Sequence, residues 1–168
     1  MIALAGKDFD IILVSGDPYA DHPLSPVGVI ARVLDAEGYK VGVIARPDWT
    51  SIEDFKRLGR PRLFFGVTSG SIDSCLANYG PLLRRREKDA SARYRSGKPE
   101  RAVIVYSNRL REAYHDIPIV IGGIEASLRR LAHYDYWENR VRRSILLDSR
   151  ADLLVYGPGE LQVIEVAR

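Results

Sequence analysis

The chain of 168 residues contains a single cysteine, Cys75, and this scarcity excludes several kinds of protein. One cysteine cannot form an internal disulfide, and it cannot by itself supply the thiolates of a zinc or iron–sulfur site. The sequence also lacks a run of about 18 apolar residues, so no membrane span is expected. Residues 1–8 do not have the basic and then apolar layout of a secretory signal. We therefore expect a cytoplasmic protein.

Three familiar motifs are missing as well. The chain has no nucleophile elbow, no Walker loop and no Gly-x-Gly-x-x-Gly fingerprint for dinucleotides. What is present suits a globular domain, because 46% of the residues are hydrophobic and 28% are charged. The length suits one domain with a sizeable core, and we treat residues 1–168 as that single domain.

Five short apolar runs recur along the chain, and each ends at turn residues. They cover residues 10–15, 40–45, 62–68, 119–121 and 152–156. Apolar strands that alternate with helices indicate a parallel sheet that is covered on both faces. We predict an α/β, flavodoxin-like open sheet of five strands in the order 2-1-3-4-5, with helices on both faces.

Helical patterns fill the intervals between these runs. They cover residues 26–38, 51–58, 71–79 and 102–114, with two shorter helices on either side of Asp135 and a last helix from Gly159. We expect Gly38 to end the first helix, and Ser69 or Ser71 to cap the third. The last helix is still amphipathic at Arg168, so we expect this chain to be the front part of a longer protein.

In such a sheet, ligands bind beyond the carboxyl ends of the strands. The loops at that edge are residues 15–22, 68–73, 122–127 and 157–160. Their candidate ligand-binding residues are Asp17, Asp21, His22, Ser69, Gly70, Gly122, Gly123, Glu125, Gly157 and Glu160. The alternatives are structural: the acids also cap turns and helices, and the glycines also allow close strand–helix packing. We predict that Cys75 is a buried small hydrophobic residue and not a nucleophile.

The segment after Gly122–Gly123 has an unusual composition, with two arginines followed by His-Tyr-Asp-Tyr-Trp at residues 133–137. Such a cluster stacks on a planar ligand or forms an interdomain surface, and the alternative is the aromatic edge of a core. Its candidate ligand-binding residues are Arg129, His133, Tyr134 and Asp135.

Ten of the 25 basic residues lie between Arg84 and Arg111, although the net charge is only +3. An Arg-rich insertion at about residues 82–101 contains most of them. This strip is either a contact surface for nucleic acid or another polyanion, or a solvated insertion.

Taken together, the longer motifs resemble the N-terminal part of the YgiQ-type (UPF0313) radical SAM proteins, and the similarity spans nearly the whole chain. The segments that carry it are residues 10–23, 42–49, 63–70, 122–130, 133–137, 142–152 and 156–160.

The resemblance implies an accessory, substrate-binding domain, related to cobalamin-binding folds, that precedes a radical SAM barrel in the same polypeptide. In that family a three-cysteine motif holds a [4Fe–4S] cluster that cleaves S-adenosylmethionine. This chain lacks that motif, so we expect no cofactor in it and no catalysis by it alone. The segment after Asp21 loosely resembles the Asp-x-His-x-x-Gly pattern of cobalamin domains, which would make His22 a cobalt ligand. The alternative is a stand-alone module for a nucleotide, a corrinoid or another anionic ligand.

Overall fold

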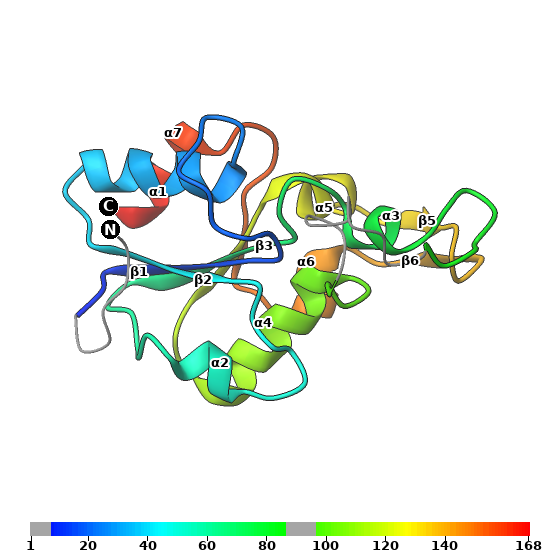
Figure 1. Ribbon diagram of the computed structural model, residues 1–168, viewed down its shortest axis with the longest axis horizontal. Coiled ribbons are helices and arrows are strands. Elements are labelled where there is room, and N and C mark those ends of the chain that lie inside the picture. Colours follow the sequence, from blue (N-terminus) through cyan, green and yellow to red (C-terminus); the bar gives the residue numbers. More distant parts are fainter. Residues whose placement is uncertain (1–7, 87–96) are drawn as a thin grey trace.

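Five parallel strands form one sheet in the computed structural model, which describes residues 8–86 and 97–168 (Figure 1). The strands are β1 (Ile11–Ser15), β2 (Val41–Ala45), β3 (Phe64–Thr68), β4 (Ile119–Ile121) and β7 (Leu153–Leu154). Their spatial order is β2-β1-β3-β4-β7. Counted among themselves, these strands have the order 2-1-3-4-5, so the predicted α/β sheet is confirmed.

Helices cover both faces of this sheet because its strands are apolar on both sides. In β1, Ile11 and Leu13 belong to a core shared with α1 (Pro26–Ala36) and α7 (Glu160–Ala167). Ile12 and Val14 belong to a second core, shared with α2 (Glu53–Lys56), α4 (Ala102–Ala113) and α6 (Ile145–Ser149). Figure 1 shows the first pair of helices above the sheet and the other three below it.

The N-termini of α1 and α3 are each capped by the side chain of the residue just before them. The Ser25 side chain accepts a hydrogen bond from Gly28 N–H at 3.3 Å, and Gly38, with φ at +89°, follows the end of α1 as predicted. The cap predicted for α3 (Ser74–Asn78) was wrong, because it is Asp73, not Ser69 or Ser71, that accepts from the first-turn N–H groups. In residues 8–86 and 97–168, no helix has the length and apolar character needed to cross a membrane.

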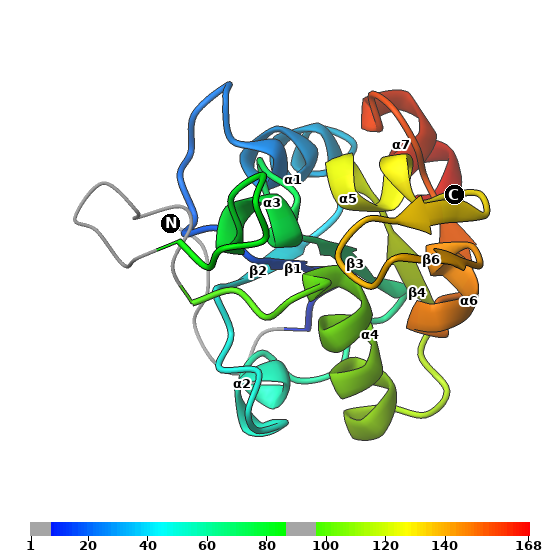
Figure 2. The ribbon, with the colours of Figure 1, turned by 90° about the vertical axis from the view of Figure 1, so that its right-hand side faces the viewer.

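A further group of elements extends past the carboxyl ends of the strands. It consists of α3, α5 (Gly123–Leu128) and an antiparallel hairpin of β5 (His133–Asp135) and β6 (Arg140–Arg142). Figure 1 shows this group to the right of the sheet, and Figure 2 shows it from its own end. The two short helices expected on either side of Asp135 are α5 and α6, but the hairpin between them was not predicted.

The predicted Arg-rich insertion lies partly outside the described residues, which omit 87–96. Its two described flanks meet at Asn78. The backbone N–H of Arg86 donates to Asn78 O at 2.8 Å, and Asn78 Nδ2 donates to Lys98 O at 3.2 Å.

Candidate functional site

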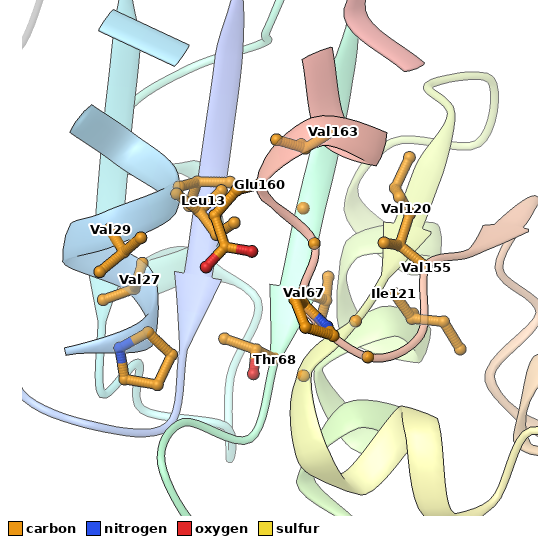
Figure 3. Close-up of a pocket in the computed structure, with 18 of the residues that line it drawn as sticks. Leu13, Val27, Val29, Val67, Thr68, Val120, Ile121, Val155, Glu160 and Val163 are labelled. Atoms are coloured by element: carbon orange, nitrogen blue, oxygen red, sulfur yellow. The ribbon is translucent and has the colours of Figure 1, made fainter. Parts of the chain in front are cut away.

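A pocket of about 440 Å³ opens at the carboxyl edge, on the face of the sheet that α1 and α7 cover (Figure 3). Its walls come from α1, from β1, β3 and β4, and from α7 and the loop that leads into it. The strand order reverses between β1 and β3, and this reversal is where ligands bind in open α/β sheets. The pocket therefore lies where the topology predicts a site.

Glycine creates much of the space in this pocket. Gly66, Gly122, Gly123, Gly157 and Gly159 all line it. A Cβ atom on Gly66 would lie 2.6 Å from Leu13 Cδ2, and one on Gly123, where φ is +81°, would collide with Thr68 Oγ1. Three of the predicted site residues, Gly122, Gly123 and Gly157, are thus brought together here.

The polar groups of the pocket are few. Glu160, another predicted site residue, begins α7 and directs its carboxylate into the pocket (Figure 3). Thr68, at the end of β3, contributes a hydroxyl group whose oxygen accepts from Gly70 N–H at 3.1 Å. The other lining side chains are almost all aliphatic, and none is lysine, arginine or histidine.

The predicted residues after β1 and β3 form a separate, buried polar cluster. Asp17 accepts hydrogen bonds from Ser71 N–H at 2.6 Å and Ser71 Oγ at 2.7 Å, and it pairs with Lys98, whose side chain is 1% exposed. Ser69 is buried and donates to Ile72 O at 3.2 Å. Gly70, with φ at +98°, lies against the Asp17 carboxylate, where a Cβ atom would collide with it. Internal contacts thus occupy this cluster.

Glu125 is fully buried and connects three helices. Its Oε2 accepts from Ser74 N–H at 2.9 Å and Ser74 Oγ at 2.5 Å, and its Oε1 accepts from Val103 N–H at 3.0 Å. Burial, together with the nearby charge of Asp73, raises the pKa of Glu125 above its usual value. These bonds cap the first turns of α3 and α4, so the contacts of Glu125 are those of a structural residue.

Two more buried ion pairs hold the extension at the carboxyl edge in place. Arg129 pairs with Asp73, the cap of α3. Arg101 Nη2 lies 2.7 Å from Oδ2 of Asp135, a residue that is only 2% exposed. Burial by itself would raise the pKa of Asp135, but hydrogen bonds from Arg101 and from two backbone N–H groups outweigh it and hold the pKa below its usual range. The predicted residues Arg129 and Asp135 therefore anchor α5 and the hairpin.

The segment between β1 and α1 places Asp21 and His22 on the surface. Asp21 forms an ion pair with Arg32 of α1, and the hydrogen bond from that arginine lowers the pKa of the carboxyl group. His22 Nδ1 accepts from Leu24 N–H at 3.1 Å, so a neutral ring carries its proton on Nε2. Binding cobalt through Nε2 would require the proton to move to Nδ1, which would break the hydrogen bond with Leu24 N–H.

The hairpin contains the remaining predicted site residues. Tyr134 is 60% exposed, and its hydroxyl donates to Asn139 Oδ1 at 2.5 Å. His133 Nδ1 lies 3.1 Å from Leu131 O, whereas its Nε2 is buried and has no hydrogen-bond partner among the described residues. The indole N–H of Trp137 is likewise buried without a partner in that part of the chain. The hairpin thus contains two unsatisfied polar atoms.

The described part of the basic strip is largely engaged in internal contacts. Lys98 and Arg101 form the buried ion pairs described above. Arg109 pairs with Glu112, and Arg111 pairs with Asp152. Arg86 donates to the backbone carbonyls of Leu76 and Tyr79. Arg84 and Arg85 are exposed, and the other members of the strip, Lys88, Arg93 and Arg95, lie outside the described residues.

Cys75 agrees with its prediction, because it is 1% exposed and burial raises the pKa of its thiol to about 11. Within residues 8–86 and 97–168, no three His, Cys, Asp or Glu side chains gather to hold a metal ion. These residues therefore do not fit the ligand set of a [4Fe–4S] cluster.

Sequence reasoning missed three charged residues of the carboxyl edge: Asp73, Lys98 and Arg101. Asp73 had a local signal, since an aspartate just before an apolar helical segment is a typical cap. The burial of Lys98 and Arg101 had no such signal, because each pairs with an acid that is distant in the sequence.

Comparison with known proteins identifies the family. The family model described as "Radical SAM N-terminal" matches residues 1–168. A UPF0313 protein of Geobacter sulfurreducens is 56% identical over 163 residues, which are 96% of this chain and 27% of that protein. UPF0313 proteins of Methanosarcina mazei and Thermotoga neapolitana are 55% and 52% identical, over 96% and 100% of this chain and 26% and 30% of their own lengths.

The chain thus spans less than a third of the length of these curated relatives and matches their N-terminal part. No solved structure matches it. The resemblance seen in the sequence motifs is confirmed, and the chain belongs to the Radical SAM N-terminal family.

Proposed function

We propose that this chain is the accessory domain of a radical SAM enzyme and that it docks, through the group at its carboxyl edge, onto a downstream barrel of the same polypeptide. There it helps to enclose the substrate, and it performs no chemistry alone. In the full-length protein the [4Fe–4S] cluster and S-adenosylmethionine would supply the radical chemistry, with ligands from outside this chain.

The observation that carries this proposal is the concentration of exposed apolar side chains on that group. In the described residues, nine of the fifteen large hydrophobic side chains that are exposed lie in α3, α5, the hairpin and the adjoining loops. They are Leu76, Leu82, Leu83, Ile124, Leu128, Leu131, Tyr134, Tyr136 and Val141. Exposed apolar side chains that gather in one region are typical of surfaces that contact another protein or domain.

The unsatisfied polar atoms of the same region agree with this interpretation. A buried donor or acceptor without a partner costs about 1–3 kcal/mol, so an isolated domain gains nothing from burying the Trp137 N–H and His133 Nε2. A change in the hairpin on docking that brought these two atoms to a hydrogen-bond partner would remove that cost. His133 and Tyr134 are accordingly the candidate residues for contact with the substrate or the barrel.

Hydrogen–deuterium exchange on the full-length protein and on the 168-residue chain tests the docking. We expect the amides of α5 and the hairpin to exchange more slowly in the full-length protein, and those of α1 to exchange equally in both. Leu131→Glu and Val141→Glu should abolish this difference in the full-length protein, because each places a charge on an exposed apolar position of the proposed contact.

Leu161→Glu is the matched control, since Leu161 is 76% exposed but lies on α7, away from the proposed contact. Equal exchange of α5 and the hairpin in the two proteins would contradict the docking proposal. So would an effect of Leu161→Glu as large as that of Leu131→Glu.

A further inference from the structure

The pocket beneath α1 and α7 has a chemical character that the family does not explain. Its walls are aliphatic, from Val27 and Ile30 of α1, Val67 of β3, and Val155 and Val163 near α7. The volume of about 440 Å³ falls within the range of about 300–1,000 Å³ that is usual for small-molecule sites. The apolar walls therefore suit the body of a small apolar molecule.

The charge in the pocket has one sign. Glu160 is the one ionisable residue that lines it, and the carboxylate has no hydrogen bond or ion pair with any other described residue. Its side chain is directed into the pocket (Figure 3), where it can pair with a cation. The lining contains no lysine, arginine or histidine side chain that could pair with the charge of an anion.

The second polar contact is Thr68, at the end of β3 next to Gly122 and Gly123. Its hydroxyl oxygen is held by Gly70 N–H, and the hydroxyl proton is free to be donated to a ligand. Thr68 therefore adds a donor for a hydroxyl or carbonyl group without changing the sign of the charge.

We propose that this pocket binds a small, compact aliphatic amine, whose ammonium group pairs with Glu160 and whose apolar body contacts α1, β3 and α7. The proposal concerns a site made by this chain alone, so it does not depend on docking to the barrel.

Three probes that share one apolar cage but differ in a single group test it. They are 1-adamantanamine, 1-adamantanol and 1-adamantanecarboxylate, and their affinities for the 168-residue chain are measured by calorimetry at neutral pH. Methyl NMR of Val27, Val155 and Val163 locates the binding. We expect the amine to bind about tenfold more tightly than the alcohol, and the carboxylate most weakly, since a hydrogen bond to a charged group contributes about 1.5–3 kcal/mol.

Variants separate the charge from the shape of the pocket. Glu160→Gln should abolish the preference for the amine over the alcohol, whereas Glu165→Gln, on the same helix but outside the pocket, should preserve it. Gly122→Ala should weaken the binding of all three probes, because it adds a methyl group to a residue that lines the pocket. The backbone tolerates the change, since φ there is −160° and the added Cβ would lie an unstrained 3.4 Å from Val155 O.

Three outcomes would overturn the proposal: equal affinities for the three probes, no shift of the pocket methyl groups at millimolar amine, or equal effects of the two glutamine variants. None of them bears on the docking proposal, which the exchange experiment on the full-length protein tests separately.

Discussion

Replacing Glu125 with alanine tests whether this residue is structural or binds a ligand. The substitution leaves the N–H groups of Ser74 and Val103 in a buried region without an acceptor. Each such group costs about 1–3 kcal/mol, so the free energy of unfolding should fall by roughly 2–6 kcal/mol. A domain is stable by only about 5–15 kcal/mol, so this loss is large.

Urea unfolding of the chain measures this loss. With a slope of about 2 kcal/mol per molar, the midpoint should fall by roughly 1–3 M. Glu165→Ala is the control, because the Glu165 side chain is 72% exposed and pairs with Arg168, which is exposed as well, and its effect should stay below about 0.5 kcal/mol. Glu125→Gln keeps one acceptor oxygen, so its loss should be intermediate, and it provides a measurable variant if the alanine variant does not fold.

The reasoning is refuted if Glu125→Ala and Glu165→Ala unfold at the same urea concentration. In that case the three hydrogen bonds of Glu125 would contribute no net stability, and its interpretation as a ligand-binding residue would regain support.

Three further predictions follow from the carboxyl edge. First, the stability of the wild type should decline relative to that of Glu125→Gln as the pH rises above 4.5, the ordinary glutamate pKa. Burial raises the pKa of Glu125 in the folded state, so the folded protein retains a proton that the unfolded chain releases. A pH-independent difference between the urea midpoints of the two proteins would contradict this prediction. Second, Gly123→Ala should lower the free energy of unfolding by about 1–3 kcal/mol more than Gly157→Ala does. Both glycines have a positive φ, but only at Gly123 would the new Cβ collide with another residue, Thr68. Equal urea midpoints for the two variants would count against the collision. Third, Cys75 should react with a thiol reagent at pH 8 far more slowly in the folded chain than in the chain unfolded by urea. Burial raises the pKa of the thiol to about 11 and keeps the reagent away from it. Equal reaction rates would show that the thiol is exposed in the folded chain.

The sheet could be predicted from the sequence because its strands carry a strong local signal. Runs such as Ile11–Ser15 and Ile119–Ile121 are apolar, short and bounded by turn residues, and those features depend only on neighbouring residues. The hairpin could not be predicted in this way. His133–Asp135 has neither an alternating apolar pattern nor a typical hairpin turn, and the Asp135 carboxylate is held by Arg101 from another element.

The candidate site shows the same division. The positions of Gly122, Gly123 and Glu160 at the carboxyl edge follow from strand order, which the sequence pattern predicts. Whether an acid at that edge faces a ligand or the interior depends on its partner. Asp17 and Glu125 are at the predicted edge, yet Lys98 and the first turns of α3 and α4 occupy them, and no local pattern shows such distant partners.

The two hydrogen bonds of Asn78 have a consequence for protein engineering. The backbones of Arg86 and Lys98 are both hydrogen-bonded to this one residue, so the fold holds the two flanks of residues 87–97 close together. Lengthening the connection between two fixed flanks costs little more entropy, about 0.6 kcal/mol for each doubling of its length. This position is therefore suited to the insertion of a peptide tag or a fluorescent reporter, while the sheet and its pocket retain their structure.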